Sequence, residues 1–179
     1  VLQNYKNMNR EAPLVRNFVR NTYRRVADTL GVERYQSVPL YLPGDTLVPE
    51  CYGRDGTLAC LRGMEGSFDR IFPITLEDEW LVPRRYLKRL DDSTAFNHVV
   101  FVDRLDQNIT TLERVDKGHW KIRSMNPATT GRHAPPYAQE TPLGMYLLQQ
   151  KKSRMVFLKD GSAATGGYAP YASRFTNGA

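Results

Sequence analysis

The sequence predicts a mainly β protein with one N-terminal helix, an α+β fold. Apolar residues repeat at helical spacing near the N-terminus, short apolar runs separated by turn residues follow, and the later part alternates apolar and polar positions. These patterns divide the chain into a helical segment (1–32), a small β module (33–92) and a second β domain (93–179).

The helix is predicted over residues 13–30. Its apolar side chains recur at every fourth position, at Leu14, Phe18, Val26 and Leu30. Pro13 suits the first helical turn and Gly31 suits the position just after the end. Such a helix could dock or anchor the protein, but packing against the rest of the domain is the simpler interpretation.

The formal net charge of +6 favours anionic partners. Much of this net charge comes from five arginines on or just before the predicted helix, Arg10, Arg16, Arg20, Arg24 and Arg25. A solvated helix face is the plain explanation, and nucleic acid or an anionic envelope polymer is the alternative. No nucleic-acid-binding motif is visible, so no nucleic-acid partner is predicted. No apolar run approaches the roughly 20 residues needed to span a bilayer, so membrane association is expected only through an N-terminal anchor outside this sequence.

The two cysteines, Cys51 and Cys60, flank Asp55-Gly56, a dipeptide typical of two-residue hairpin turns. In such a hairpin the two thiols would face each other, and they would form either a disulfide or two small buried apolar side chains. Neither cysteine has a nearby residue typical of a catalytic thiol. The histidines are scattered at His98, His119 and His133. No metal site and no cofactor are therefore predicted.

The region from residue 33 to residue 92 reads as four or five short strands, which suggests a small barrel or curled sheet. Its last strand, "WLVPRRYL" (80–87), resembles the final strands of SH3-like domains, where a tryptophan precedes an apolar-Pro step. The resemblance implies a module that binds peptide or glycan strands if it has an aromatic groove. A spacer is the alternative.

The second β domain is predicted to begin with a β-meander. A buried-type strand, Val99–Val102, is followed by a partner strand, a turn at Asp116-Lys117-Gly118, and a returning strand. Specific residues then follow one another in a fixed order. They are Asp103, Gln107, Gly118, Trp120, Thr130, Gly131, Thr141, Pro142, Gly144 and Tyr146.

This succession resembles the first half of the L,D-transpeptidase catalytic domain, the YkuD type. The resemblance implies an incomplete β-sandwich in which Thr141-Pro142-x-Gly144 is scaffold and residues 145–148 begin a central strand. It also implies that the Gly- and aromatic-rich tail forms a mobile flap. In that flap Tyr168, Tyr171 and Phe175 would line a substrate groove and Arg174 would meet a substrate carboxylate. The alternative is a solvent loop with its aromatic side chains folded onto the sheet.

The chemistry of that family depends on a later Ser-His-Gly-Cys segment, which these 179 residues do not contain, so no catalytic residue is assigned in this chain. We therefore expect that the parent protein is longer than these 179 residues. The alternatives are that its catalytic part has been cut off and lost, that this part exists as another chain, or that the protein is a catalytically inactive member of the family. The function implied is a peptidoglycan L,D-transpeptidase, or a carboxypeptidase if water is the acceptor. It would act on stem peptides in the periplasm or cell envelope of a bacterium. The alternative is a non-catalytic wall-binding protein.

Overall fold

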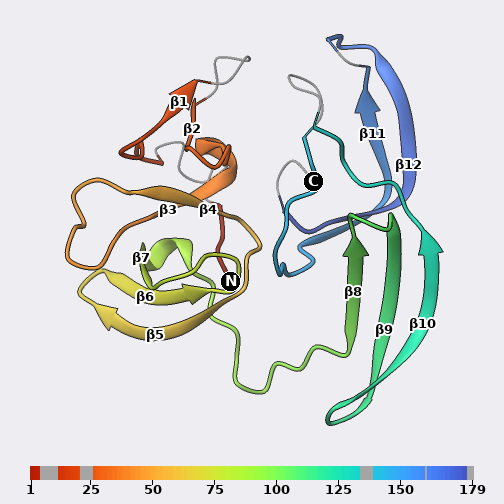
Figure 1. Cartoon of the computed structure of the whole chain (residues 1–179), viewed down its shortest axis with the longest axis horizontal. Coiled ribbons are helices and arrows are strands. Elements are labelled where there is room, and N and C mark those ends of the chain that lie inside the picture. Colours follow the sequence, from red (N-terminus) through yellow and green to blue (C-terminus); the bar gives the residue numbers. More distant parts are fainter. Residues whose placement is uncertain (5–11, 21–25, 134–138, 160, 177–179) are drawn as a thin grey trace. The chain divides into compact units, whose positions relative to one another are not determined.

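The computed structural model describes residues 1–4, 12–20, 26–133, 139–159 and 161–176, and in these residues the protein is all-β (Figure 1). The helical elements are two short 3-10 turns, η1 (Arg34–Gln36) and η2 (Arg84–Tyr86), and no helix of seven or more residues occurs in this described part. The predicted α+β class and its N-terminal helix are therefore wrong.

A short antiparallel pair replaces the described part of the predicted helix: β1 (Val19–Arg20) runs against β2 (Val26–Ala27). Leu14, Phe18 and Leu30, which the helical pattern assigned to a buried stripe, are exposed. A long-range hydrogen bond holds this region instead, from the Tyr52 hydroxyl to the Pro13 carbonyl at 2.7 Å. Tertiary partners thus override the helical periodicity.

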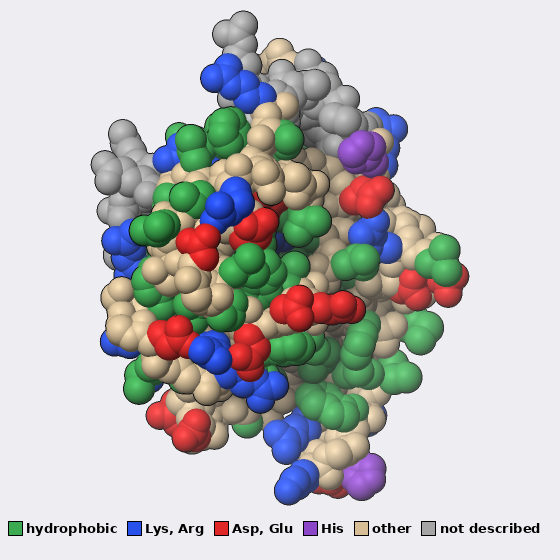
Figure 2. Space-filling model, turned by 60° about the vertical axis from the view of Figure 1, so that its left-hand side comes forward, with side chains coloured by type: hydrophobic (Ala, Val, Ile, Leu, Met, Phe, Trp, Pro, Cys, Tyr) green, Lys and Arg blue, Asp and Glu red, His purple; other side chains and the backbone are tan. Residues whose placement is uncertain are grey.

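The arginines that the structure describes in this region do not form the predicted helix face. Arg10, Arg24 and Arg25 lie outside the described residues, and Arg20 lies in β1. Arg16 forms ion pairs with Asp45 and Glu50. On the face shown in Figure 2, acidic and basic side chains likewise lie beside one another among hydrophobic ones.

The chain forms two compact units, one of residues 1–89 with 142–179 and one of residues 90–141. These units differ from the predicted three-part division, because the C-terminal segment belongs with the N-terminal β module. In the first unit, β3 (Ser37–Leu40) pairs with β4 (Cys51–Arg54). A meander follows, formed by β5 (Ala59–Glu65), β6 (Phe68–Pro73) and β7 (Trp80–Pro83).

The core of the first unit lies where these two sheets meet. Tyr41 and Leu81 exchange two backbone hydrogen bonds and so join the end of β3 to β7. Leu2 is fully buried, and its backbone bonds to residues 56 and 57. The buried cluster consists of Leu2, Val38, Leu40, Cys51, Ile71, Val82 and Tyr86. Strands β3 and β6–β7 agree with the predicted strand positions.

The predicted cysteine hairpin is wrong. Asp55-Gly56 does turn the chain, with Gly56 at φ +84°, but β4 pairs with β3 and β5 pairs with β6. Cys51 therefore lies opposite Leu40 and is buried, whereas Cys60 is exposed and free. Each strand finds a better partner elsewhere in the sequence than across the turn.

The second unit is the predicted meander, with strand order β10-β9-β8. Its strands are β8 (His98–Asp103), β9 (Asn108–Asp116) and β10 (His119–Pro127). The strand positions are confirmed, but the expected burial of β8 is not, since Val100, Phe101 and Val102 are exposed.

A long hairpin ends the first unit: β11 (Gln150–Leu158) pairs with β12 (Thr165–Arg174). The strand predicted over 145–148 is reduced to a single bridge between Tyr146 and Thr57. No helical segment in the described ranges has the length and apolar character needed to cross a membrane.

Candidate functional site

Within the second unit, hydrogen bonds join two pairs of residues of the predicted motif, Gln107 with Thr130 and Gly131 with Thr141. Asp103 Oδ1 accepts the backbone N–H groups of residues 105 and 106, which closes the turn after β8. Gln107 follows at φ +49° and projects its amide onto Thr130. Gly131 N donates to Thr141 Oγ1 at 2.8 Å, which ties the chain after β10 to the motif threonine.

Gln107 makes two of these hydrogen bonds. Its Oε1 accepts the Thr130 N–H at 2.9 Å, and its Nε2 donates to Thr130 Oγ1 at 2.6 Å. Nε2 also donates to the Arg104 carbonyl. One amide thus satisfies three polar groups that strand pairing leaves free. Gly131 is required here, because a Cβ would lie 2.3 Å from the Gln139 carbonyl oxygen.

The rest of the motif belongs to the first unit. Gly144 has φ +140°, and a Cβ there would lie 2.3 Å from the Thr75 side chain. Tyr146 bridges to Thr57, and Leu147 N donates to the Gly56 carbonyl at 2.8 Å. Gly144 thus lets the chain pass close to the β module, which is a structural role, as the resemblance implies.

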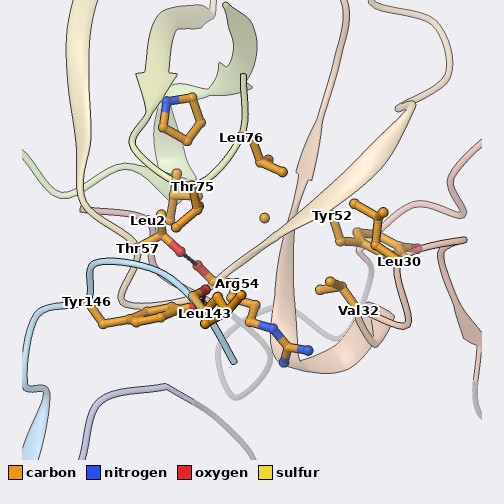
Figure 3. A pocket seen from close by; sticks show the side chains of 12 residues that line it. Leu2, Leu30, Val32, Tyr52, Arg54, Thr57, Thr75, Leu76, Leu143 and Tyr146 are labelled. Atoms are coloured by element: carbon orange, nitrogen blue, oxygen red, sulfur yellow. Dashed lines mark hydrogen bonds between the residues drawn. The ribbon is translucent and has the colours of Figure 1, made fainter. Parts of the chain in front are cut away.

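The first unit contains a pocket of about 130 Å³ (Figure 3). Leu30, Val32 and Tyr52 lie together on one side of it, and Thr75 and Leu76 lie above (Figure 3). Its other lining residues are Leu2, Gly53, Arg54, Thr57, Pro73, Leu143 and Tyr146. The wall is mostly apolar, so the pocket suits a small apolar group.

Arg54 is the one charged side chain that lines this pocket. It is half-buried, and no acidic side chain in the described part of the chain forms an ion pair with it. Burial raises the pKa of neighbouring Tyr146, and the Arg54 guanidinium acts in the opposite direction. The Tyr146 hydroxyl donates to the Leu143 carbonyl at 2.9 Å. The pocket therefore has apolar walls and one arginine at its edge, whose guanidinium is directed away from Thr75 and Leu76 (Figure 3).

The sequence did not assign Arg54 to a site. It stands one residue before the predicted turn, and nothing local distinguishes it from the other arginines. Tyr146 was assigned to scaffold only. The Arg54 and Tyr146 side chains come together because residues 142–147 pack against the β module. No local sequence pattern predicts this packing.

The four predicted substrate residues separate into two groups. Phe175 packs on Tyr146, with ring centroids 5.4 Å apart, and so stands next to the pocket residues. Arg174 ends β12 opposite Gln150. Tyr168 and Tyr171 lie on the outer hairpin, 59% and 86% exposed. Tyr168 and Phe175 are seven residues apart, roughly 20 Å along an extended chain, so the rings of Tyr168 and Phe175 do not line one small pocket.

The residues after β12 are fixed to the β module by polar contacts. Thr176 Oγ1 donates to Asp55 Oδ1 at 2.8 Å, and both residues are buried. Gln149 Nε2 donates to the Phe175 carbonyl at 2.7 Å. Gly56 leaves room for that carbonyl, since a Cβ would lie 2.2 Å from it.

The thiols do not form a catalytic centre. Burial is the main cause that raises the pKa of Cys51 to about 12, so its thiolate is suppressed. Cys60 is exposed on β5 of the first unit, whereas the three histidines all belong to the second unit. No cluster of metal-ligating side chains is found among the residues that the structure describes.

Comparisons with models of known protein families, with curated proteins and with solved structures found no match. The resemblance to L,D-transpeptidases is therefore carried by the motif residues alone.

Proposed function

We propose that this chain is the stem-peptide-binding part of a peptidoglycan L,D-transpeptidase. The observation that carries the proposal is the pair of contacts that join motif residues distant in the sequence, Gln107 with Thr130 and Gly131 N with Thr141. Asp103 closes the turn that leads into Gln107. These contacts give the spacing of the motif a physical reason.

In the proposed reaction a cysteine thiolate attacks the carbonyl carbon of the bond between a diamino acid and D-Ala. The C–N bond breaks, D-Ala leaves with a proton on its nitrogen, and a thioester remains. An amine of a neighbouring stem peptide then displaces the thiolate and forms the cross-link. Neither Cys51 nor Cys60 is placed for this attack, so the 179 residues are proposed to bind the peptide without cleaving it.

The pocket beside Arg54 is the proposed position of the carboxylate end of the peptide. A guanidinium with no acidic partner among the described residues favours a carboxylate, and the apolar wall favours the adjoining methyl group. Phe175 and Tyr146 supply aromatic surface beside it. This placement uses one of the two groups of predicted substrate residues and leaves Tyr168 and Tyr171 for another role.

Titration with a soluble stem tetrapeptide, followed by NMR shifts of backbone amides, tests the proposal. Arg54→Gln is expected to weaken binding about tenfold, the effect of one charge-assisted hydrogen bond to a partly exposed group. Arg62→Gln is the matched control, since Arg62 is an exposed arginine on β5 that does not line the pocket. An equal loss of binding affinity in both variants would contradict the proposal. So would a titration in which the backbone amide signals of Thr57 and Tyr146 do not shift.

A second readout separates an enzyme from a wall-binding protein. We expect no release of D-Ala from the tetrapeptide by the 179-residue chain, because the thiolate is absent. Release by a longer product of the same gene, lost when its additional cysteine is replaced, would support the transpeptidase. Binding without release by any product would favour the non-catalytic alternative.

A further inference from the structure

The hairpin β11–β12 carries most of the excess charge of the protein. Residues 150–174 contain five basic residues and one acidic residue, which is +4 of the formal +6. The basic residues are Lys151, Lys152, Arg154, Lys159 and Arg174. The two strands of this hairpin are the β11 and β12 that Figure 1 shows side by side.

The cations of the first strand are not neutralised by acidic side chains of the residues that the structure describes. No ion pair joins Lys151, Lys152 or Arg154 to an acidic side chain in the described ranges, and every residue of β11 is exposed. The Arg154 guanidinium lies over the Tyr168 ring instead, 4.4 Å from its centroid. The hairpin therefore presents a positive field to solvent, unlike Arg16, Arg70, Arg84 and Arg89, which face carboxylates.

The same strand becomes apolar toward the hairpin end. Met155, Val156, Phe157 and Leu158 follow one another and are all exposed, Leu158 at 59%. Four consecutive exposed apolar residues on an unpartnered hairpin are unfavourable in water and mark a surface that contacts something apolar.

One face of the hairpin combines both properties. Val156 lies opposite Tyr168 in the register, and Arg154 and Leu158 share the Val156 side because side chains alternate along a strand. This face, defined by Arg154, Val156, Leu158 and Tyr168, is called the basic-apolar face. It carries a cation, two aliphatic side chains and an amphipathic aromatic ring in adjacent positions.

We propose that the basic-apolar face binds the surface of an anionic lipid bilayer. Lysine and arginine side chains are attracted to anionic headgroups, a tyrosine ring suits the level of the headgroups, and the aliphatic side chains enter the boundary with the acyl chains. The hairpin lies on the bilayer and does not cross it, since the open edges of a two-stranded sheet cannot be satisfied in hydrocarbon. A nucleic acid would use the cations and the tyrosine but would leave the aliphatic run in water.

This proposal does not rest on the peptide-binding function, which uses the pocket beside Arg54. It gives Tyr168 a contact outside any substrate groove.

Sedimentation with vesicles tests the proposal. The whole chain is mixed with phosphatidylcholine vesicles that either contain or lack phosphatidylglycerol. Lys152→Gln with Arg154→Gln, which removes two cations from the Val156 side of β11, is expected to lower partitioning onto anionic vesicles about 30-fold, at about fivefold for each cation. Leu158→Ser is expected to lower it about tenfold. Lys117→Gln and Leu105→Ser, at exposed positions of the second unit, are matched controls expected to change it less than about twofold.

Insertion is measured with Tyr168→Trp, which places an indole on the basic-apolar face and keeps an aromatic ring under Arg154. A blue shift of its fluorescence is expected with anionic vesicles, and binding should weaken as salt rises. Equal sedimentation with neutral vesicles would overturn the proposal. So would binding to a single-stranded oligonucleotide with no blue shift on vesicles, which would assign the hairpin to a polyanion instead.

Discussion

Asp28→Ala is expected to destabilise the first unit strongly, because Asp28 holds three backbone groups at once. The carboxylate is 1% exposed. Its Oδ1 accepts the N–H groups of Leu30 and Val32, and its Oδ2 accepts the N–H of Tyr52, each at 2.9 Å. One side chain thus closes the turn after β2 and attaches it to β4.

The magnitude follows from which donors lose their acceptor. The N–H of Leu30 lies near the surface and can bond to water, whereas Val32 and Tyr52 are buried. A hydrogen bond to a charged acceptor contributes about 1.5–3 kcal/mol, and a buried donor left unpaired costs a similar amount. Two such donors give a loss of about 4 kcal/mol, a large part of the stability of a small domain.

Urea unfolding followed by tryptophan fluorescence measures this loss. Trp80 lies in the first unit and Trp120 in the second, so a Trp120→Phe background makes the signal report on the first unit. Asp45→Ala is the matched control, because Asp45 lies in the same unit and accepts the backbone N–H of Leu47, two residues on, in an exposed hydrogen bond. It should cost less than about 1 kcal/mol, including its exposed ion pair with Arg16. A loss below about 1 kcal/mol for Asp28→Ala would refute the reasoning.

Gly56→Ala should lower the free energy of unfolding by about 3 kcal/mol, since the new Cβ adds a clash to a strained positive φ. Gly66 also has a positive φ (+57°) but has open space around it, so Gly66→Ala should lower it by only about 1 kcal/mol. Equal urea midpoints for the two variants would contradict this prediction. A thiol reagent at about pH 8 should titrate exposed Cys60 in the native protein and buried Cys51 only after unfolding. Because burial is the main cause that raises the pKa of Cys51 from 9.0 to about 12, stability should be full below pH 9 and fall toward pH 12. The fall due to this thiol is at most about 1.4 kcal/mol per pH unit. Cys51→Ala should remove the fall between about pH 9 and pH 10, since the tyrosines whose pKa burial also raises, such as Tyr52, contribute only above pH 10. Gln107→Ala should destabilise the second unit by about 1 kcal/mol, because it removes exposed hydrogen bonds between the β8–β9 turn and the chain after β10. Trp120 fluorescence during urea unfolding measures this loss.

The candidate site was only partly predictable. Gln107 and Thr130 were singled out by their order in the sequence, and the structure joins them by two hydrogen bonds. The sequence did not single out Arg54, because its place beside the pocket depends on Tyr146, a neighbour in space that is distant in the sequence. Phe175 was predicted to line a groove and does lie on Tyr146, but Tyr168 lies elsewhere on the same strand.

The sequence by itself determined the strands whose signals are local. The turn at Gly118 and the alternation on either side of it were enough to predict the meander of β8, β9 and β10, because a hairpin needs only its own turn and its adjacent strands. The strands β3, β6 and β7 were read from their turn residues in the same way.

Only the tertiary structure decided the remainder. Residues 13–30 have helical periodicity, but Asp28, Tyr52 and Pro13 bond across the fold, and those contacts outweigh a weak local preference. Strand β4 pairs with β3 and not with β5. Residues 142–176 pack in the first unit, where they form hydrogen bonds to Asp55 and Gly56. Each of these outcomes is a competition between a local pairing and a distant one, and the distant partner is not visible in a local pattern.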